Sequence, residues 1–302
     1  MRDCKREGAL SMLKQRIISG LFLAGGFILV ATLAHPIVAW LLLIAISSMA
    51  QMEFYSIINV AGIPVFRGVG TLCGAALISA TYYCAGPGLE NIALAYRWEQ
   101  LVLTAAMMAV FIRQFPQKHN NRPLATVACT LLGIWYVPFL FNFFTRLAFF
   151  WDAELDGRTI GTTGIALLIY LVGVVKFTDA AAFFSGKYLG RHKLFPRISP
   201  AKTWEGFAGG LAGGVLVSVV ILWISGFKLG GIFFGPGHAV ICGLLLSVAG
   251  VAGDMFESLL KRSSGIKDSG KVVPGMGGFL DILDSLLFGA PVLYAYIVFF
   301  LQ

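Results

Sequence analysis

Residues 254–284 read DMFESLLKRSSGIKDSGKVVPGMGGFLDILD and form a polar, glycine-rich segment between two apolar runs. Asp254 and Glu257 are three residues apart, as are Asp281 and Asp284, so each pair shares one face of a helix. Charged groups at membrane depth are costly unless they are paired, hydrated or bound to a metal. The segment therefore predicts an oxygen-rich site for a hard cation such as Mg²⁺, with lysines nearby to hold an anion.

The rest of the chain is strongly apolar. Its 302 residues are 58% hydrophobic and 13% charged, with a mean hydropathy of +0.82. Soluble domains carry about 25% charged residues. The net charge of +8 resides mainly in loops between apolar runs, which is typical of the positive-inside rule and of attraction to anionic lipid, and does not suggest nucleic acid. The five cysteines show no metal-binding spacing and predict buried thiols. We therefore expect an all-α, polytopic integral membrane protein.

Membrane spans are expected wherever about 20 mainly apolar residues follow one another. By that rule the chain has about nine candidates. They are Ile17–Ala34, Ile37–Ile58, Val69–Ala85, Leu94–Ile112, Leu124–Leu147, Thr163–Phe183, Phe207–Ile224, Ala239–Leu260 and Ile282–Leu301.

The charges of the connecting loops alternate along the chain. Lys and Arg gather before the first span and after the even-numbered spans, whereas acidic residues gather on the opposite side. Because Lys and Arg favour the cytoplasm, we predict a cytoplasmic N-terminus and cytoplasmic active-site loops in a bacterial-type inner membrane. We further expect residues 1–160, with about five spans, to act as scaffold or oligomer contact. Residues 161–302, with about four spans, are expected to carry the site in a cytoplasm-facing polar cavity.

A second polar segment, residues 176–206, reads KFTDAAAFFSGKYLGRHKLFPRISPAKTWEG. Asp179 falls inside an apolar span, so its solvation cost demands a reason. Ser199 or Thr203 is expected to cap the next helix, and a helix N-terminus favours phosphate. Glu53, inside the second span, is expected to pair with a basic residue, and we assign it no role.

Both segments resemble the phosphatidate cytidylyltransferase (CDP-diacylglycerol synthase) family. The family signature runs S-x-L-K-R, four residues, K-D-x-G, and then a P-G-H-G-G stretch before D-R-hydrophobic-D. The matching residues are Ser258, Leu260, Lys261, Arg262, Lys267, Asp268, Gly270, Val273, Pro274, Gly275, Gly277, Gly278, Asp281 and Asp284. The earlier segment is similar to the family strings D-x-x-A-Y-x-x-G-K and S-P-x-K-T-W-E-G. The resemblance covers mainly the C-terminal half, and the chain departs from it at Met276 (usually His), Ile282 (usually Arg) and Phe183 (often Tyr).

The resemblance implies that CTP and phosphatidate react at the bilayer to give CDP-diacylglycerol and pyrophosphate, a step of phospholipid biosynthesis. It implies Mg²⁺ as cofactor, with a second cation left open, and Asp254, Asp281 and Asp284 as its ligands. The implied catalytic residues are Asp179, Lys202, Lys267 and Asp268. The implied substrate-binding residues are Ser199, Lys202, Thr203, Ser258, Arg262, Lys267, Lys271, Gly277 and Gly278. A homodimer is left open.

Other interpretations of these residues remain. Asp254 and Glu257 could form a structural ion pair with Lys261, and Arg262 could anchor a helix end at the lipid headgroups. A CTP-dependent lipid kinase would also use CTP and a membrane alcohol as substrates. A carrier would use intramembrane carboxylates as well, but at a midplane site between repeated halves. A non-catalytic scaffold would have no need of four carboxylates at such cost.

Overall fold

The computed structural model describes residues 36–85, 89–115, 120–151, 161–266, 269–270 and 277–301. Within these ranges the chain is almost entirely helical, as expected. The helices are α2 (Pro36–Val60), α3 (Arg67–Tyr83), α4 (Leu89–Gln114), α5 (Pro123–Ile134), the π-helical segment η1 (Trp135–Phe139), α6 (Leu140–Phe149), α7 (Thr162–Leu189), α8 (Trp204–Ile224), α9 (Pro236–Ser263) and α10 (Phe279–Phe300). Two short antiparallel hairpins complete the list: β1 (Lys193–Phe195) with β2 (Ser199–Thr203), and β3 (Lys228–Leu229) with β4 (Ile232–Phe233).

Six helical segments in the described part of the chain are long and apolar enough to cross a membrane. They are α2, the continuous α5–η1–α6 segment, α7, α8, α9 and α10. The predicted count of nine is not confirmed. The predicted span Ile17–Ala34 lies outside the described residues, and the predicted spans Val69–Ala85 and Leu94–Ile112 coincide with helices α3 and α4, which fall outside this set. Helix α3 has only 17 residues, and charged residues such as Arg97 and Glu99 lower the hydropathy of α4.

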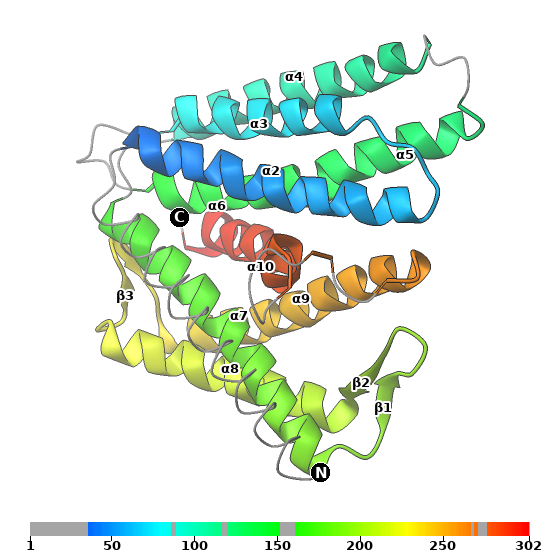
Figure 1. Cartoon of the computed structure of the whole chain (residues 1–302). Helices are drawn as coiled ribbons and strands as arrows, with labels where there is room; N and C mark the ends of the chain where they lie inside the picture. The colour runs from blue at the N-terminus through cyan, green and yellow to red at the C-terminus, as the bar shows by residue number, and fades with distance from the viewer. Residues whose placement is uncertain are drawn as a thin grey trace.

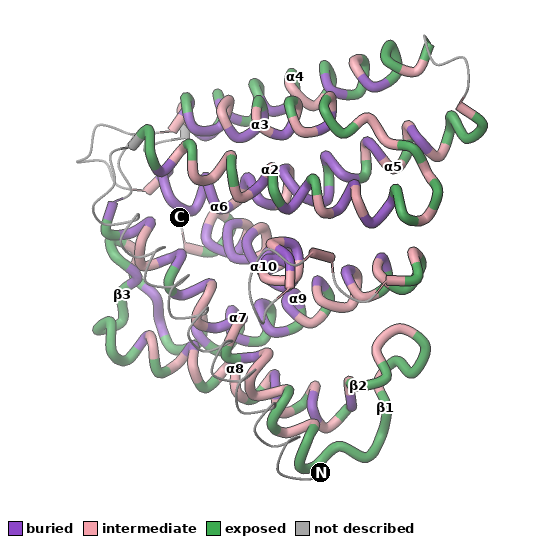
Figure 2. The backbone as a smooth tube through the Cα atoms, viewed as in Figure 1, coloured by how far each residue is buried: buried purple, intermediate pink, exposed green. Residues whose placement is uncertain are grey.

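Helix α10 lies at the centre of the molecule. Figure 1 shows it between α2–α6 on one side and α7–α9 on the other, and it contacts α2, α6, α7 and α9. It is also the most buried of the six segments, with 61% of its apolar window inside the protein. Figure 2 shows the same helix largely in the colour of buried residues. The polar residues at its N-terminus are therefore held by elements from both halves of the chain.

Small residues bring α7, α8 and α9 close together. A Cβ atom at Gly213 of α8 would overlap Ala181 of α7, and one at Gly214 would overlap Ser247 of α9. Such contacts are typical of helix packing in membranes, where lipid offers no hydrophobic drive and close backbone approach supplies the attraction. They pack α8 against both α7 and α9, and these two helices carry site residues.

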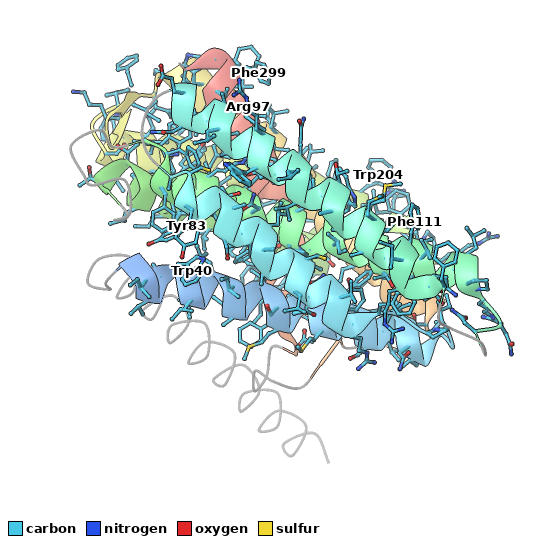
Figure 3. The ribbon with its side chains drawn as sticks, turned by 90° about the horizontal axis from the view of Figure 1, so that it is seen from above. Trp40, Tyr83, Arg97, Phe111, Trp204 and Phe299 are labelled. Carbon is cyan, nitrogen blue, oxygen red and sulfur yellow. The ribbon has the colours of Figure 1, made fainter. Side chains whose placement is uncertain are left out.

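Large apolar side chains cover the outside of the helices. Figure 3 shows Tyr83, Phe111, Trp204 and Phe299 on the outer surface, and their exposed fractions are 63%, 38%, 55% and 79%. An exposed aromatic surface of this extent would aggregate in water but suits a bilayer. The fold is that of a polytopic membrane protein.

Candidate active site

Three carboxylates converge where α9 crosses α10. Asp254 and Glu257 lie one helical turn apart on α9, Asp284 lies on α10, and one oxygen of each falls within 4.8 Å of the others. Gly253 permits this approach, because a Cβ atom there would collide with the Asp284 carbonyl oxygen. Glu257 and Asp284 are buried, at 1% and 7% exposure, and Asp254 is partly exposed.

One oxygen of this group has no donor. Glu257 Oε1 is buried and has no hydrogen-bond partner among the residues that the structure describes. Its other oxygen, Oε2, lies 2.6 Å from Lys261 Nζ. Leaving a buried carboxylate oxygen unpaired costs free energy, so this oxygen is available to a ligand as far as the described residues are concerned.

Lysines compensate part of the negative charge. Lys202 Nζ, on the hairpin strand β2, lies 2.8 Å from Asp254 Oδ2. Lys261 Nζ contacts two carboxylates: it lies 2.7 Å from Asp281 Oδ1, and it also contacts Glu257 Oε2. The predicted i, i+4 pair of Glu257 and Lys261 therefore exists, but it is part of a larger set of charges.

Helix α7 joins the cluster through Lys176 and Asp179. Lys176 Nζ donates to the carbonyl of Ile282, at 2.8 Å, and to Ser285 Oγ, at 3.1 Å. The Ser285 hydroxyl donates to Asp179 Oδ2 at 3.2 Å, and Lys176 Nζ lies 3.8 Å from the same oxygen. Ser285 directly follows Asp284, whose Oδ1 accepts the Ser285 N–H at 2.5 Å. The contacts thus fix α7 against the part of α10 that carries Asp284.

The formal charges of this region do not cancel. Its members among the described residues are the carboxylates Asp179, Asp254, Glu257, Asp281 and Asp284 and the ammonium groups Lys176, Lys202 and Lys261. Among these groups the carboxylates outnumber the ammonium groups by five to three, so a cation would be attracted.

Beside the carboxylates lies a cavity of about 280 Å³. Its walls come from the end of α7, the β1–β2 hairpin, the start of α8 and one turn of α9. They are Asp179, Ala182, Phe183, Gly186, Lys187, Leu194, Ala201, Lys202, Thr203, Gly206, Phe207, Val251 and Asp254. Acidic, basic and aromatic groups therefore face one space, with Asp254 common to cavity and cluster.

Local contacts explain the form of the hairpin wall. Thr203 begins α8 as its N-cap, because its hydroxyl oxygen accepts the Gly206 N–H at 3.1 Å, which confirms one of the two predicted caps. The Glu205 carboxylate accepts the backbone N–H groups of Arg191 and His192 and lies 2.7 Å from His192 Nδ1. These contacts fix the β1–β2 hairpin next to the start of α8 (Figure 1), and Lys202 of that hairpin lines the cavity.

Asp281 faces a different set of partners from Asp284. Its Oδ2 accepts the Gly278 N–H at 2.6 Å, the Ser269 N–H at 3.2 Å and the Ser269 hydroxyl at 2.7 Å. Gly277 adopts φ +97°, a conformation that favours glycine, and a Cβ atom there would overlap the Asp281 carboxylate. Asp281 therefore caps the N-terminus of α10, whereas Asp284 points to Asp254 and Glu257.

The structure brings together some predicted site residues and leaves others apart. Asp179, Lys202, Asp254 and Asp284 gather around the cavity and the cluster. The hydroxyl of Ser258 donates to Asp254 Oδ1 at 3.4 Å and so lies next to the cluster. Ser199 pairs with Phe195 in the hairpin, and Arg262 is exposed near the end of α9. The N–H of Gly278 is already taken by Asp281. Lys267, Asp268 and Lys271 lie outside the described residues.

Two contributors were not predicted from the sequence. Lys176 bridges α7 and α10, and Glu53 of α2 accepts the backbone N–H groups of Phe279 and Leu280. Glu257 was predicted to share the oxygen-rich site with Asp254, but not as one of the metal ligands, and it joins the carboxylate group. The expected basic partner of Glu53 is not found among the described residues. For Lys176 a signal existed, because a lysine three residues before Asp179 in an apolar span is as costly as the aspartate itself.

Comparison with known proteins identifies the family of the chain. Residues 14–300 match the model of the cytidylyltransferase family. The chain is 29% identical over 290 residues to the phosphatidate cytidylyltransferase of Bacillus subtilis, covering 95% of this chain and 98% of that protein. It is 32% identical over 253 residues to that of Staphylococcus haemolyticus, covering 84% and 85% of the two chains. It is 31% identical over 215 residues to that of Synechocystis, covering 66% and 70%.

Proposed function

The chain belongs to the cytidylyltransferase family, and from that membership we propose that it transfers the cytidylyl group of CTP to phosphatidate, forming CDP-diacylglycerol and pyrophosphate. The relatives named above are phosphatidate cytidylyltransferases, which supports this pair of substrates. A membrane-embedded site suits the reaction, because one substrate is a lipid and the other is a water-soluble nucleotide.

In the proposed reaction, an oxygen of the lipid phosphate attacks the α-phosphorus of CTP. A new bond forms between that oxygen and the phosphorus. The bond from the phosphorus to the oxygen that bridges the α- and β-phosphates breaks, and pyrophosphate leaves with the electron pair. The lipid supplies the nucleophile, so the protein has to align two polyanions and screen their repulsion.

The converging carboxylates fit a hard divalent cation such as Mg²⁺. All donors are oxygen atoms, carboxylates outnumber ammonium groups around them in the described part of the chain, and Glu257 Oε1 lacks a donor there. We propose Asp254, Glu257 and Asp284 as the residues that hold the ion. When bound, such an ion polarises phosphate oxygens and neutralises charge that builds up on them. Asp281 stays a predicted ligand on the resemblance alone, because its oxygens accept from Lys261, Ser269 and Gly278.

The walls of the cavity suggest how the lipid is held. Lys202 and Lys187 line the cavity and supply positive charge that would attract a phosphate. Phe183 lines the same cavity and is 62% exposed on the outside. We propose that the acyl chains reach the cavity sideways past this residue, while Lys202 orients the lipid phosphate toward the carboxylates.

Other parts of the proposal rest on the family resemblance. Lys267 and Lys271 are proposed to screen the triphosphate, and Asp268 is proposed as a catalytic residue. Residues 161–302 are proposed to carry the site, with residues 1–160 as the supporting half. The cytoplasmic orientation of the site follows from the distribution of basic loops.

The observation that carries the proposal is the convergence of Asp254, Glu257 and Asp284 beside a lysine-bearing cavity. The test is incubation of purified protein with phosphatidate and CTP labelled in the cytidine, followed by lipid extraction. We expect label in the lipid fraction and release of pyrophosphate. A CTP-dependent lipid kinase would instead leave the label in CDP and give a phosphorylated lipid without cytidine, which would overturn the proposal.

A further inference from the structure

Glu53 makes contacts that no step of the proposed reaction explains. It lies on α2, in the half of the chain expected to be scaffold, yet its carboxylate reaches the N-terminus of α10. Oε1 accepts the Phe279 N–H at 3.0 Å, and Oε2 accepts the Leu280 N–H at 2.8 Å. The Ser269 hydroxyl donates to Oε2 at 3.3 Å. A carboxylate inside an apolar helix is costly, so these contacts give it a reason to be there.

The chain closes tightly around this carboxylate. A Cβ atom at Gly270 would lie 2.7 Å from Glu53 Oε1, and one at Gly278 would overlap Oε2. The absence of a side chain at Gly270 and Gly278 therefore leaves the space that the Glu53 carboxylate fills. The fit is specific to the side chain of Glu53, because the packing is against its oxygen atoms.

Glu53 and Asp281 together occupy the start of α10. The first N–H groups of a helix have no partner within the helix, and they attract negative charge. Asp281 accepts the N–H of Gly278, and Glu53 accepts those of Phe279 and Leu280. Two carboxylates of the protein therefore cap the N-terminus of α10, and one of them, Glu53, comes from the N-terminal half of the chain.

The position of Asp284 depends on this arrangement. Asp284 follows Leu280 by four residues, so the two lie on the same face of α10, about one turn apart. A rotation or shift at Leu280 would be carried through the helix to the carboxylate that meets Asp254 and Glu257. The position of the backbone at Leu280 is thus linked to the geometry of the three carboxylates.

We propose that Glu53 is a positioning residue, which fixes α10 so that Asp284 can share a divalent cation with Asp254 and Glu257. This inference rests on the proposed function for its cation, but it concerns binding of the cation, which is measurable without turnover. It also gives the N-terminal half of the chain a part in the site. Partners that orient metal ligands are commonly worth about 10- to 100-fold in metal affinity or activity.

The test uses Mn²⁺, titrated into the full-length protein in detergent and followed by electron paramagnetic resonance. Glu53→Gln keeps the shape of the side chain but brings an NH₂ group toward the N–H groups of α10. We expect Mn²⁺ affinity to fall by about 10- to 100-fold and kcat to fall with it, with little change in the KM for CTP. Glu90→Gln, at an exposed position on α4, is the matched control and should bind Mn²⁺ as the unaltered protein does.

A second pair of variants removes one contact without touching Glu53. Phe279→Pro deletes the N–H that Glu53 Oε1 accepts, and proline suits the first position of a helix. Phe279→Ala keeps that N–H and loses the same ring. We expect Phe279→Pro to weaken Mn²⁺ binding several-fold more than Phe279→Ala, and to add little when combined with Glu53→Gln, because both remove one interaction.

Three results would overturn the inference. One is Mn²⁺ affinity within twofold of the unaltered protein in a folded Glu53→Gln variant. Another is a raised KM for CTP with unchanged Mn²⁺ binding, which would make Glu53 a substrate contact. The third is absence of Mn²⁺ binding by the unaltered protein, since there would then be no ion to position. If the cytidylyl transfer itself is not observed, the Mn²⁺ titrations still decide the role of Glu53.

Discussion

The two halves of the molecule bury charge in opposite ways. Near one end of the N-terminal helices, Arg146 and Glu99 are 2% and 3% exposed and form a pair in which both carboxylate oxygens are engaged. Asn142 donates to the same Glu99 at 2.9 Å, and the Arg146 guanidinium stacks on Tyr96 at 3.9 Å from the ring centre. The charge of each partner is met by the other, although Arg146 Nη1 has no hydrogen-bond partner among the described residues.

In the C-terminal helices, groups of like charge meet. Asp254, Glu257 and Asp284 converge within 4.8 Å, and the neighbouring lysines leave part of their charge uncompensated. Bringing carboxylates together in a low dielectric is unfavourable, so the arrangement persists only because the surrounding helices hold it. The comparison separates two uses of buried charge: a closed pair that holds helices together, and an open group that we propose is completed by a cation. The predictions below test that separation.

The largest effect is expected from breaking the closed pair. Arg146→Met leaves Glu99 buried without its partner, and we expect the free energy of unfolding in detergent to fall by about 3–5 kcal/mol. The double variant Glu99→Gln with Arg146→Met should recover most of that loss, because no unpaired charge remains. Arg97→Met, on the exposed face of α4 (Figure 3), is the control and should stay within about 0.5 kcal/mol of the unaltered protein. A stable Arg146→Met variant would contradict the structural role of the pair.

Removing one of the three converging carboxylates should have the opposite effect: activity should fall strongly, while the free energy of unfolding should not fall. Asp284→Asn is expected to lower the rate of labelled-lipid formation by more than about 100-fold, because a ligand matters at least as much as the residues that orient it. The free energy of unfolding without added metal should be unchanged or higher, since repulsion between like charges is relieved. Activity within twofold of the unaltered protein would remove Asp284 from the site.

Added metal should stabilise the protein through the three carboxylates and not through the Arg146–Glu99 pair, so measurements of stability can distinguish the two groups of charges. Mg²⁺ at 100 times its dissociation constant is expected to raise the free energy of unfolding by about 2.7 kcal/mol, and EDTA should abolish the gain. The gain should persist in the Arg146→Met variant and vanish in Asp284→Asn. Equal stabilisation of Asp284→Asn and of the unaltered protein would show that the ion binds elsewhere.

Much of the fold was predictable, because it depends on local patterns. Apolar runs of sufficient length predicted every described helical span, and the spacing of Asp254 and Asp284 at the ends of two such runs predicted that they meet. The break at η1 was not predicted, although Pro138 inside the run was a signal for it. The predicted count of nine spans is not confirmed, because in the described part of the chain α3 and α4 are not both long and apolar enough to join the six candidate spans.

The finer geometry of the site was not predictable from spacing. A separation of three residues says that Asp281 and Asp284 share a face of α10, but not how α10 is rotated against α9. That rotation places Asp284 next to Glu257, and it places Asp281 where it forms an ion pair with Lys261. Glu53 was noticed as a carboxylate in an apolar run, but its partners lie more than 200 residues away in the chain, beyond any local pattern.

The smallest effect is expected at Lys202, and it tests which charges in the C-terminal half serve the anion. Lys202 lines the cavity and lies 2.8 Å from Asp254, so it competes with a cation for that carboxylate. Lys202→Met should therefore raise the KM for CTP or for phosphatidate by about tenfold, a cost of about 1.4 kcal/mol, and leave the Mg²⁺ requirement unchanged or lower.

Lys187→Met is the matched control for Lys202→Met, because Lys187 lines the same cavity and forms no ion pair among the described residues. Steady-state kinetics should show a smaller rise in KM for Lys187→Met, of about twofold, because an exposed charge is worth less than one held in contact. Equal effects of the two variants would mean that the cavity attracts phosphate through its overall potential. A raised Mg²⁺ requirement in Lys202→Met would mean that Lys202 supports the carboxylates rather than competing for them. In that case the C-terminal group would be closed by lysines as the N-terminal pair is closed by Arg146, and the contrast between the two halves would be lost.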